Sequence, residues 1–280
     1  MSDTRARDLL AHLDDLPPVQ VLYTDLDGTL LGPGGSLLTA PDGQPSLRAA
    51  RALVSARCAG ITVVPVSGRR AASLAVDSRL MGLADAIAEV GTVILRSGEK
   101  RYEWGDCPRN LGDTPRAALR EAGALDALLD AFAGQLRTYH PWDAEREGGH
   151  LLHGRVDVDA ANAVLARAGC PWAQVIDNGG RDLRAYHLIA RGAGKAIAIT
   201  DDLADRGLRP DQAAAIGDSV GDRTMATAVS TYIQVANGHG DLGGPIFGVP
   251  GAMGDGFADA VDAILTASRS PRRREDRPRR

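Results

Sequence analysis

Residues 21–30 constrain this chain most, because an apolar run there leads directly into two aspartates. The run Val-Leu-Tyr-Thr is apolar and partly β-branched, which is typical of a buried strand, and it ends at Asp25-Leu-Asp27-Gly-Thr. Two carboxylates one residue apart at the exit of a buried strand are costly unless a cation lies beside them. A hard divalent cation suits such oxygen ligands. We therefore predict a Mg²⁺ site at the C-terminal edge of a parallel sheet, where open α/β folds bind their ligands.

Alternating strand and helix patterns surround this stretch. Apolar strands are predicted near residues 61–66, 86–90, 213–216 and 231–235. Helices are predicted over residues 4–14, 46–59, 194–205, 224–228 and 256–267, with a further helix ending near Met81. The helix over 46–59 is expected to bury the face that carries Leu47, Ala50, Leu53, Val54 and Cys58. This order predicts an α/β fold, with a Rossmann-like parallel sheet and helices on both faces.

The middle of the chain carries a different pattern. A hairpin is predicted over residues 92–104 around Gly98, helices over 115–132 and 158–168, a strand over 151–156, and a second hairpin over 173–189 through Asn178-Gly179. Strands joined by turns, with helices between them, predict an α+β module. We therefore expect an inserted α+β cap domain over residues 96–187, within a discontinuous core of residues 1–95 and 188–268.

The distribution of charge narrows the classes of partner. The net charge of −4 combines a tail of about +5 over residues 269–280 with a remainder of about −9. The tail has no apolar residue and is expected to be disordered. An acidic body argues against a nucleic-acid-binding domain.

The cysteines and the apolar segments indicate which structural sites and which cellular compartment to expect. Three scattered cysteines without a CxxC motif indicate neither a zinc site nor a disulfide framework. Residues 1–14 contain no apolar signal segment, and no run approaches the roughly 18 apolar residues of a membrane span. We expect a cytoplasmic protein with no nucleic-acid or membrane partner, and the sequence does not indicate an oligomeric state.

Further polar groups follow the other predicted strands or begin a predicted helix. Ser67 follows the second strand, Asp218 and Asp222 follow the strand at 213–216, and Lys195 begins a helix. Because the carboxyl ends of parallel strands meet at one edge, these groups are expected to converge with Asp25.

Each of these features also has a simpler interpretation when taken alone. The Asp-x-Asp-Gly segment resembles a turn or a calcium-loop fragment, although its spacing does not fit an EF-hand. Ser67 could be a helix N-cap, and Lys195 could be a surface lysine. Asp218 and Asp222 could be charges favoured at a helix N-terminus.

In their order and strand context, these segments resemble the four motifs of the haloacid dehalogenase superfamily. The first is Asp-Leu-Asp-Gly-Thr-Leu at 25–30, the second Val-Ser-Gly-Arg at 66–69, the third Gly-Lys-Ala at 194–196, and the fourth Gly-Asp-Ser-Val-Gly-Asp at 217–222. The position of the insert resembles the large-cap branch, which includes Cof-type, sucrose-phosphate and mannosyl-3-phosphoglycerate phosphatases. Two positions depart from the family: Gly221 and Val90 stand where relatives often carry Asn.

The resemblance implies a role for each motif residue. Asp25 would be the nucleophile that forms an aspartyl phosphate, and Asp27 would transfer protons to the leaving group and from water. Lys195 would be a further catalytic residue. The phosphate contacts would come from Ser67, Gly68 and Lys195. The Mg²⁺ ligands would be Asp25, Asp27 through its backbone carbonyl, Asp218 and Asp222.

The expected function is Mg²⁺-dependent hydrolysis of a small phosphorylated metabolite, such as a sugar phosphate or a related phosphomonoester. The alternatives are a phosphomutase or phosphotransferase of the same superfamily, and a non-catalytic binding module. The cap would select the leaving group, and its candidate contact residues are Tyr139, His140, His150, His153, Arg155, Arg184, Tyr186 and His187.

Overall fold

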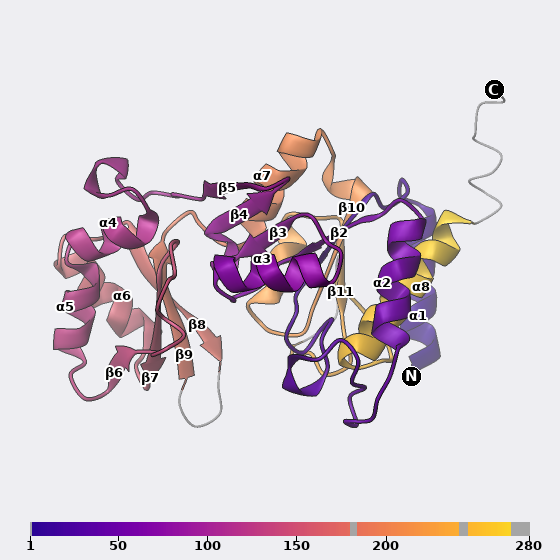
Figure 1. The fold of residues 1–280 in the computed structure, drawn as a ribbon, viewed down its shortest axis with the longest axis horizontal. Coiled ribbons are helices and arrows are strands. Elements are labelled where there is room, and N and C mark those ends of the chain that lie inside the picture. Colours follow the sequence, from indigo (N-terminus) through magenta and orange to yellow (C-terminus); the bar gives the residue numbers. More distant parts are fainter. Residues whose placement is uncertain (1, 180–183, 241–245, 270–280) are drawn as a thin grey trace. The chain divides into compact units, whose positions relative to one another are not determined.

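The computed structural model describes residues 2–179, 184–240 and 246–269 (Figure 1). The chain folds as two compact units: unit 1 comprises residues 1–66 and 199–280, and unit 2 comprises residues 67–198. The expected core and cap boundaries near 96 and 187 differ from this division and stay a prediction. Within the described part of the chain, no helix combines the length and the apolar character that crossing a bilayer requires.

Unit 1 is built on a parallel five-stranded sheet with the order β12-β11-β10-β1-β2. Its strands are β1 (Val21–Thr24), β2 (Thr62–Pro65), β10 (Ala213–Gly217), β11 (Thr231–Gln234) and β12 (Ile246–Gly248). Every residue of β1 and β10 is buried, as expected of central strands in a parallel sheet. The predicted α/β fold with a parallel sheet is confirmed.

Three helices of unit 1 lie side by side (Figure 1). They are α1 (Ser2–Asp14), α2 (Arg48–Cys58) and α8 (Met253–Ser268), and α8 packs against both of the others. In place of the predicted helix over 224–228, the chain forms a 3₁₀ segment, η5 (Asp222–Thr227). Two shorter 3₁₀ turns are η1 (Pro33–Gly35) and η4 (Pro210–Gln212).

The predicted apolar face of α2 was wrong. Leu53 is buried as expected, but Leu47 and Val54 are 53% and 57% exposed. The other buried residues of this helix are alanines, and one of them, Ala49, faces Gly254 of α8. A Cβ on Gly254 would lie 2.9 Å from the Ala49 Cβ, so the two helices approach each other through small residues.

Unit 2 contains a small antiparallel sheet of β3 (Ala86–Ala88), β4 (Val93–Arg96) and β5 (Glu99–Tyr102), preceded by α3 (Ala71–Leu80). The strand near 86–90 was predicted to extend the parallel sheet, and this pairing was wrong. A 3₁₀ turn, η2 (Glu89–Gly91), reverses the chain directly after β3, so β3 pairs antiparallel with β4. The predicted hairpin around Gly98 is confirmed.

A second antiparallel sheet of unit 2 has the order β6-β7-β9-β8. Its strands are β6 (Leu136–Thr138), β7 (His150–Gly154), β8 (Ala173–Gly179) and β9 (Arg184–Ala190). The predicted pairing of the last two is confirmed. Residues 178–179, predicted as the turn, lie inside β8, and residues 180–183 fall outside the described part of the chain.

Helices α4 (Pro115–Glu121), α5 (Ala124–Ala131) and α6 (Val158–Arg167) cover one face of the four-stranded sheet (Figure 1). Gly123 has φ +72° and separates α4 from α5 within the stretch predicted as helical over 115–132. A further 3₁₀ turn, η3 (Arg109–Leu111), precedes them, and α7 (Lys195–Arg206) begins in unit 2 and continues into unit 1. The predicted α+β cap module is confirmed.

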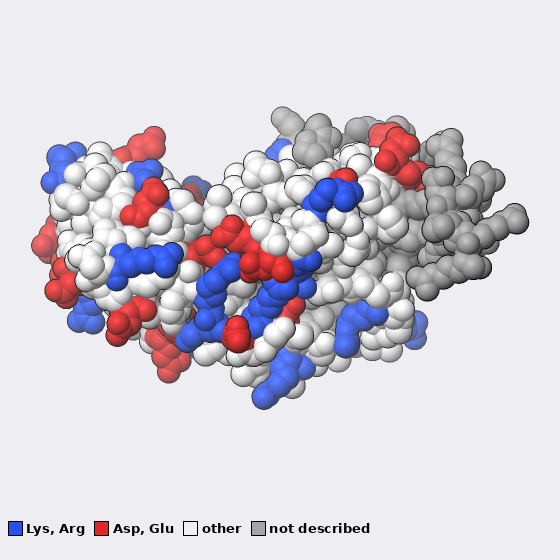
Figure 2. Space-filling view, turned by 90° about the horizontal axis from the view of Figure 1, so that it is seen from above, with Lys and Arg blue, Asp and Glu red and all other residues white. Residues whose placement is uncertain are grey.

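Charges of both signs are interspersed on the face seen in Figure 2, which shows no broad surface of a single sign. The ion pairs of unit 2 include Arg69–Asp77, Arg70–Glu145 and Lys100–Glu147. Exposed pairs of this kind contribute little to stability. The predicted basic tail lies, from residue 270 onward, outside the described residues.

Candidate active site

The two central strands of unit 1 bring the first and fourth motifs to the same edge of the sheet. Strands β1 and β10 run parallel, with Thr24 opposite Ile216, and the Asp25 amide donates a 2.9 Å hydrogen bond to the Ile216 carbonyl. Asp25 and Asp218 each follow the last residue of their strand. The convergence predicted from the strand ends is therefore found for these two residues.

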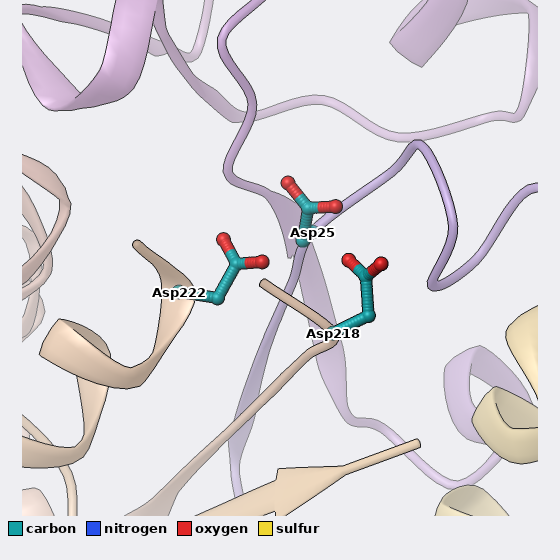
Figure 3. A group of neighbouring side chains, drawn as sticks. All are labelled: Asp25, Asp218 and Asp222. Carbon is teal, nitrogen blue, oxygen red and sulfur yellow. The ribbon is translucent and has the colours of Figure 1, made fainter. Parts of the chain in front are cut away.

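Asp25, Asp218 and Asp222 form a compact carboxylate group (Figure 3). One carboxylate oxygen from each residue lies within 4.8 Å of the other two. Asp25 is 8% exposed and Asp222 is 1% exposed. Three carboxylates at this range repel one another strongly where water is largely excluded. Their donor set is oxygen only, so it fits a hard cation such as Mg²⁺.

Asp218 is held by two residues that lie far from it in the sequence. The Thr29 hydroxyl donates to Asp218 Oδ1 at 3.2 Å, and Asn237 Nδ2 lies 3.3 Å from Asp218 Oδ2. The same Asn237 amide donates to the Gly28 carbonyl at 2.9 Å. Thr29 belongs to the first motif, but no role was assigned to it from the sequence. Both residues orient the carboxylate of Asp218.

Gly28 is required by its backbone conformation and by its close approach to Asp218. Its φ is +89°, which disfavours residues that carry a side chain. A Cβ at this position would lie 2.7 Å from Asp218 Oδ2. The glycine of the first motif thus leaves room for the carboxylate of the fourth.

Asp222 is oriented by Ser219, whose backbone amide and hydroxyl both donate to Oδ2, at 2.9 and 2.6 Å. This arrangement makes a tight turn after β10 and points Asp222 back toward Asp25 (Figure 3). Beside it, Tyr232 of β11 is fully buried. Burial, followed by the charges of Asp222 and Asp25, raises the pKa of the Tyr232 phenol.

Asp27 is exposed and does not contribute to the three-carboxylate group. Its position two residues after Asp25 places it on the loop that leaves β1, and its backbone bridges to Leu31. Solvent exposure suits a side chain that exchanges protons. The predicted roles of Asp27 stay a prediction.

The second motif lies in unit 2. Ser67 is 2% exposed, and its hydroxyl accepts a 3.2 Å hydrogen bond from the Arg69 amide. Helix α3 begins after Arg70, so Ser67 is not its N-cap. The interpretation of Ser67 as a helix cap was wrong, and its hydroxyl instead shapes the loop at residues 67–70.

Lys195 is the first residue of α7 and is half-buried. Gly91, with φ +98°, packs directly against the chain just before it. A Cβ on Gly91 would collide with the Gly194 carbonyl group and lie 2.5 Å from the Lys195 amide nitrogen. The turn η2 therefore sets the start of α7 inside unit 2. Glu89 and Val90 of the same turn have φ of +52° and +57°, a strained conformation that often occurs near functional sites.

Two buried charged residues, not predicted from the sequence, fix the second motif inside unit 2. Arg146 is 4% exposed, and its guanidinium donates to the Gly68 carbonyl at 3.0 and 2.5 Å. The Glu89 carboxylate accepts hydrogen bonds from the amides of Ala71, Glu147 and Gly148. Neither residue has a periodic sequence signal, because each acts through contacts with distant positions, 78 residues away for Arg146 and up to 59 for Glu89.

His187, one of the predicted cap candidates, packs against the second motif within unit 2. Its Nε2 lies 3.4 Å from the position that a Cβ on Gly68 would occupy. Burial, followed by the charges of Arg146 and Lys195, lowers the pKa of this imidazole well below its ordinary value. These surroundings favour the neutral form of the His187 imidazole.

The other cap candidates fall into separate places. Arg155, Arg184 and Tyr186 line a cavity of about 560 Å³, which also involves Phe132, Gln135, Val156 and Asp157. Tyr139 and His153 stack on each other with ring centroids 4.5 Å apart.

His150 is buried beside Asp143, with Nδ1 3.6 Å from the carboxylate. Burial alone would raise the pKa of Asp143, but His150, the Arg116 guanidinium and the Leu151 amide together hold it far below its ordinary value. Asp143 is therefore a buried, ionised carboxylate that ties α4 to the loop before β7.

No family model matches the chain. It is 29% identical over 252 residues to a phosphoglycolate phosphatase of Methanoculleus marisnigri. The aligned residues cover 87% of this chain and 95% of the relative. It shares its fold with the sucrose-phosphatase of Synechocystis, solved with sucrose and phosphate (TM-score 0.62, 18% identity, 89% and 99% of the two chains).

A phosphatase of the haloalkanoate (HAD) enzyme superfamily from Bacteroides thetaiotaomicron also has this fold. The TM-score is 0.64, with 18% identity over 90% of this chain and 96% of that chain. The motifs, the parallel sheet with its cap and these relatives agree, and the resemblance stated from the sequence is confirmed. The chain is therefore similar in sequence to phosphoglycolate phosphatases and shares the fold of haloacid dehalogenase-like phosphatases.

Proposed function

We propose that this protein is a Mg²⁺-dependent phosphatase that hydrolyses a small phosphomonoester through an aspartyl phosphate on Asp25. The observation that carries the proposal is the convergence of Asp25, Asp218 and Asp222 at the carboxyl edge of β1 and β10. A carboxylate group of this kind supports binding of a divalent cation by these three residues and the Asp27 carbonyl. When bound, the cation would neutralise charge and let an anionic nucleophile approach an anionic phosphate.

The chain's own residues then divide the reaction into two displacements. A carboxylate oxygen of Asp25 attacks phosphorus, the bond to the leaving oxygen breaks, and Asp27 donates a proton to that oxygen. In the second step, Asp27 takes a proton from water, the water oxygen attacks phosphorus, and Asp25 is released with inorganic phosphate. The exposure of Asp27 supports this role, since a proton-transfer group must reach both the leaving oxygen and the attacking water.

Ser67, Gly68 and Lys195 are proposed as the residues that bind the phosphoryl group. The support is the match of their motifs and their local structure in unit 2. Ser67 and Gly68 lie in a loop fixed by Arg146, and Lys195 lies at a helix start fixed by Gly91. A lysine ammonium would neutralise charge that develops on the phosphoryl oxygens.

The relatives support a choice of substrates for the first tests. One is named for phosphoglycolate and another was solved with sucrose and phosphate, so small metabolites with a single phosphoester are the first substrates to test. We propose a phosphomonoester of a hydroxy acid or of a sugar.

Phosphate release from phosphoglycolate, sugar phosphates and an aryl phosphate, each with Mg²⁺ and with a chelator, tests the proposal. We expect Mg²⁺-dependent release, and Asp25→Asn is expected to abolish turnover while the protein keeps its circular dichroism spectrum. Retained turnover in that variant would exclude Asp25 as the nucleophile. Isomerisation of a sugar phosphate without release of phosphate would instead favour the phosphomutase alternative.

Asp27→Asn separates the two steps. An aryl leaving group needs no proton, so this variant is expected to become phosphorylated by an aryl phosphate but to release phosphate slowly. Rapid-quench kinetics should then show a burst of the phenol product close to one per protein chain. Intact-mass measurement should show one added phosphoryl group that hydroxylamine removes. A variant that loses the burst together with turnover would contradict the assigned role of Asp27.

A further inference from the structure

The hydroxyl of Tyr232 is a buried donor beside the carboxylate group. Tyr232 is 0% exposed, and among the described residues its hydroxyl has no hydrogen-bond partner. Leaving a buried hydroxyl without a partner is costly, and a phenylalanine would fill the same space at no such cost. Packing of β11 alone therefore does not explain why this position carries a tyrosine rather than a phenylalanine.

The geometry of the sheet directs this hydroxyl to Asp222. Tyr232 lies opposite Ala215 on the neighbouring strand β10, and Ala215 and Gly217 point to the same face. A Cβ on Gly217 would lie 2.7 Å from the Tyr232 hydroxyl and 2.9 Å from Asp222 Cγ. Because Gly217 has no side chain, the phenol and the carboxylate can both lie next to this position. The charges of Asp222, Asp25 and Asp218 all act on the phenol.

We propose that Tyr232 is a positioning residue of the metal site, whose hydroxyl donates a hydrogen bond to Asp222 when a divalent cation is bound. The inference rests on the proposed function, because it assigns Asp222 to that cation. Ser219 already holds one oxygen of Asp222, Oδ2, through its amide and hydroxyl. A second donor on the other side of the carboxylate would fix its orientation once the cation offsets the repulsion among the three aspartates.

This role predicts different effects on metal affinity and on the stability of the metal-free protein. A hydrogen bond that forms only in the metal-bound protein contributes to metal affinity and not to the stability of the metal-free fold. Residues that orient metal ligands in this way typically change metal affinity by tenfold or more when they are removed. Tyr232→Phe is therefore expected to weaken Mg²⁺ binding about tenfold, while the metal-free protein is at least as stable as the wild type because the unpartnered hydroxyl is gone.

The chain offers a matched control in Tyr23 of β1, a central strand of the same sheet that β10 separates from β11. Tyr23 is also fully buried in the same sheet, but its hydroxyl donates a 2.7 Å hydrogen bond to Asp202. Tyr23→Phe is expected to lower the stability of the metal-free protein and to leave Mg²⁺ affinity within about twofold of the wild type. Each variant removes one tyrosine hydroxyl from the same sheet. Tyr232→Phe should lower Mg²⁺ affinity, whereas Tyr23→Phe should lower the stability of the metal-free protein.

Isothermal titration of the full-length chain with Mg²⁺, together with urea unfolding in the presence of a chelator, measures both quantities. Unchanged Mg²⁺ affinity in Tyr232→Phe would overturn this inference and leave the proposed function standing. A wild-type chain that binds no Mg²⁺ would overturn both. In addition, Mg²⁺ should shift the ultraviolet absorption of a tyrosine in the wild type, a measurement that needs no variant to fold, and in Tyr23→Phe. Absence of that shift in both would also overturn the inference.

Discussion

Replacement of Gly28 by alanine tests whether the first motif is shaped to leave room for Asp218. The backbone of Gly28 has φ +89°, and a Cβ there would lie 2.7 Å from Asp218 Oδ2. The substitution therefore has two separate consequences. One is the backbone strain of a side chain at positive φ, and the other is displacement of a carboxylate that contributes to the metal group.

The backbone consequence alone is about 1–2 kcal/mol for an L-residue in the left-handed region. Displacement of Asp218 also disturbs its contacts with Thr29 and Asn237, each worth about 1 kcal/mol. We therefore expect Gly28→Ala to lower the free energy of unfolding by about 3–4 kcal/mol in total. Because the displaced group is a proposed metal ligand, Mg²⁺ affinity should also fall by about tenfold or more.

Gly43 provides the matched control. Its φ of +85° is nearly that of Gly28, but a Cβ there would have no other atom within 4 Å. Gly43→Ala is expected to lower stability by about 1–2 kcal/mol and to leave Mg²⁺ binding unchanged. The difference between the two variants isolates the contact with Asp218.

The assay combines urea unfolding without metal and calorimetric titration with Mg²⁺. Two-state unfolding curves with equal slopes would let the change in free energy be read from the midpoints. If Gly28→Ala and Gly43→Ala lose the same stability and bind Mg²⁺ equally well, the argument that Gly28 makes room for the Asp218 carboxylate is refuted.

Two further predictions concern the buried charges of unit 2. The pKa of Asp143 is lowered in the folded state. Its ionised carboxylate therefore stabilises the fold above the ordinary pKa of about 3.9, and this stabilisation is lost as the pH falls below that value. Asp143→Asn should therefore lower the free energy of unfolding by about 2–4 kcal/mol at pH 7. In urea titrations at acid pH, the difference in stability between the variant and the wild type should disappear. A difference that does not depend on pH would contradict an ionised Asp143. Arg146→Gln removes the donors to the Gly68 carbonyl and should weaken competitive inhibition by inorganic phosphate about fivefold in steady-state kinetics. The exposed Arg137→Gln should leave that inhibition unchanged, and equal effects in both variants would argue against a positioning role for Arg146.

Local patterns in the sequence were sufficient to predict the edge of unit 1 at which the carboxylates converge. An apolar run followed by Asp25, and a second followed by Asp218, indicate two buried strands whose ends carry carboxylates. Parallel pairing then requires these ends to meet, and the structure confirms that they do. This prediction succeeded because strand burial and chain direction follow from residues close together in the sequence.

Packing between helices was not accessible in the same way. The predicted face of α2 favoured large apolar residues, whereas the structure buries alanines against α8 and exposes Leu47 and Val54. The close approach of Ala49 to Gly254 decides which face is buried, and these two residues are about two hundred positions apart. Periodicity within one helix cannot show how closely a distant helix approaches it.

The sequence by itself determined the motif residues, the order of the strands along the chain and the type of chemistry that paired carboxylates at a strand end support. Only the tertiary structure decided which residues hold those groups in place. Asn237 on Asp218, Arg146 on Gly68 and Tyr232 beside Asp222 each act across a long separation in sequence. The physical reason is that a strand or a loop follows from neighbouring residues, whereas the orientation of a buried carboxylate follows from the donors that the fold brings to it.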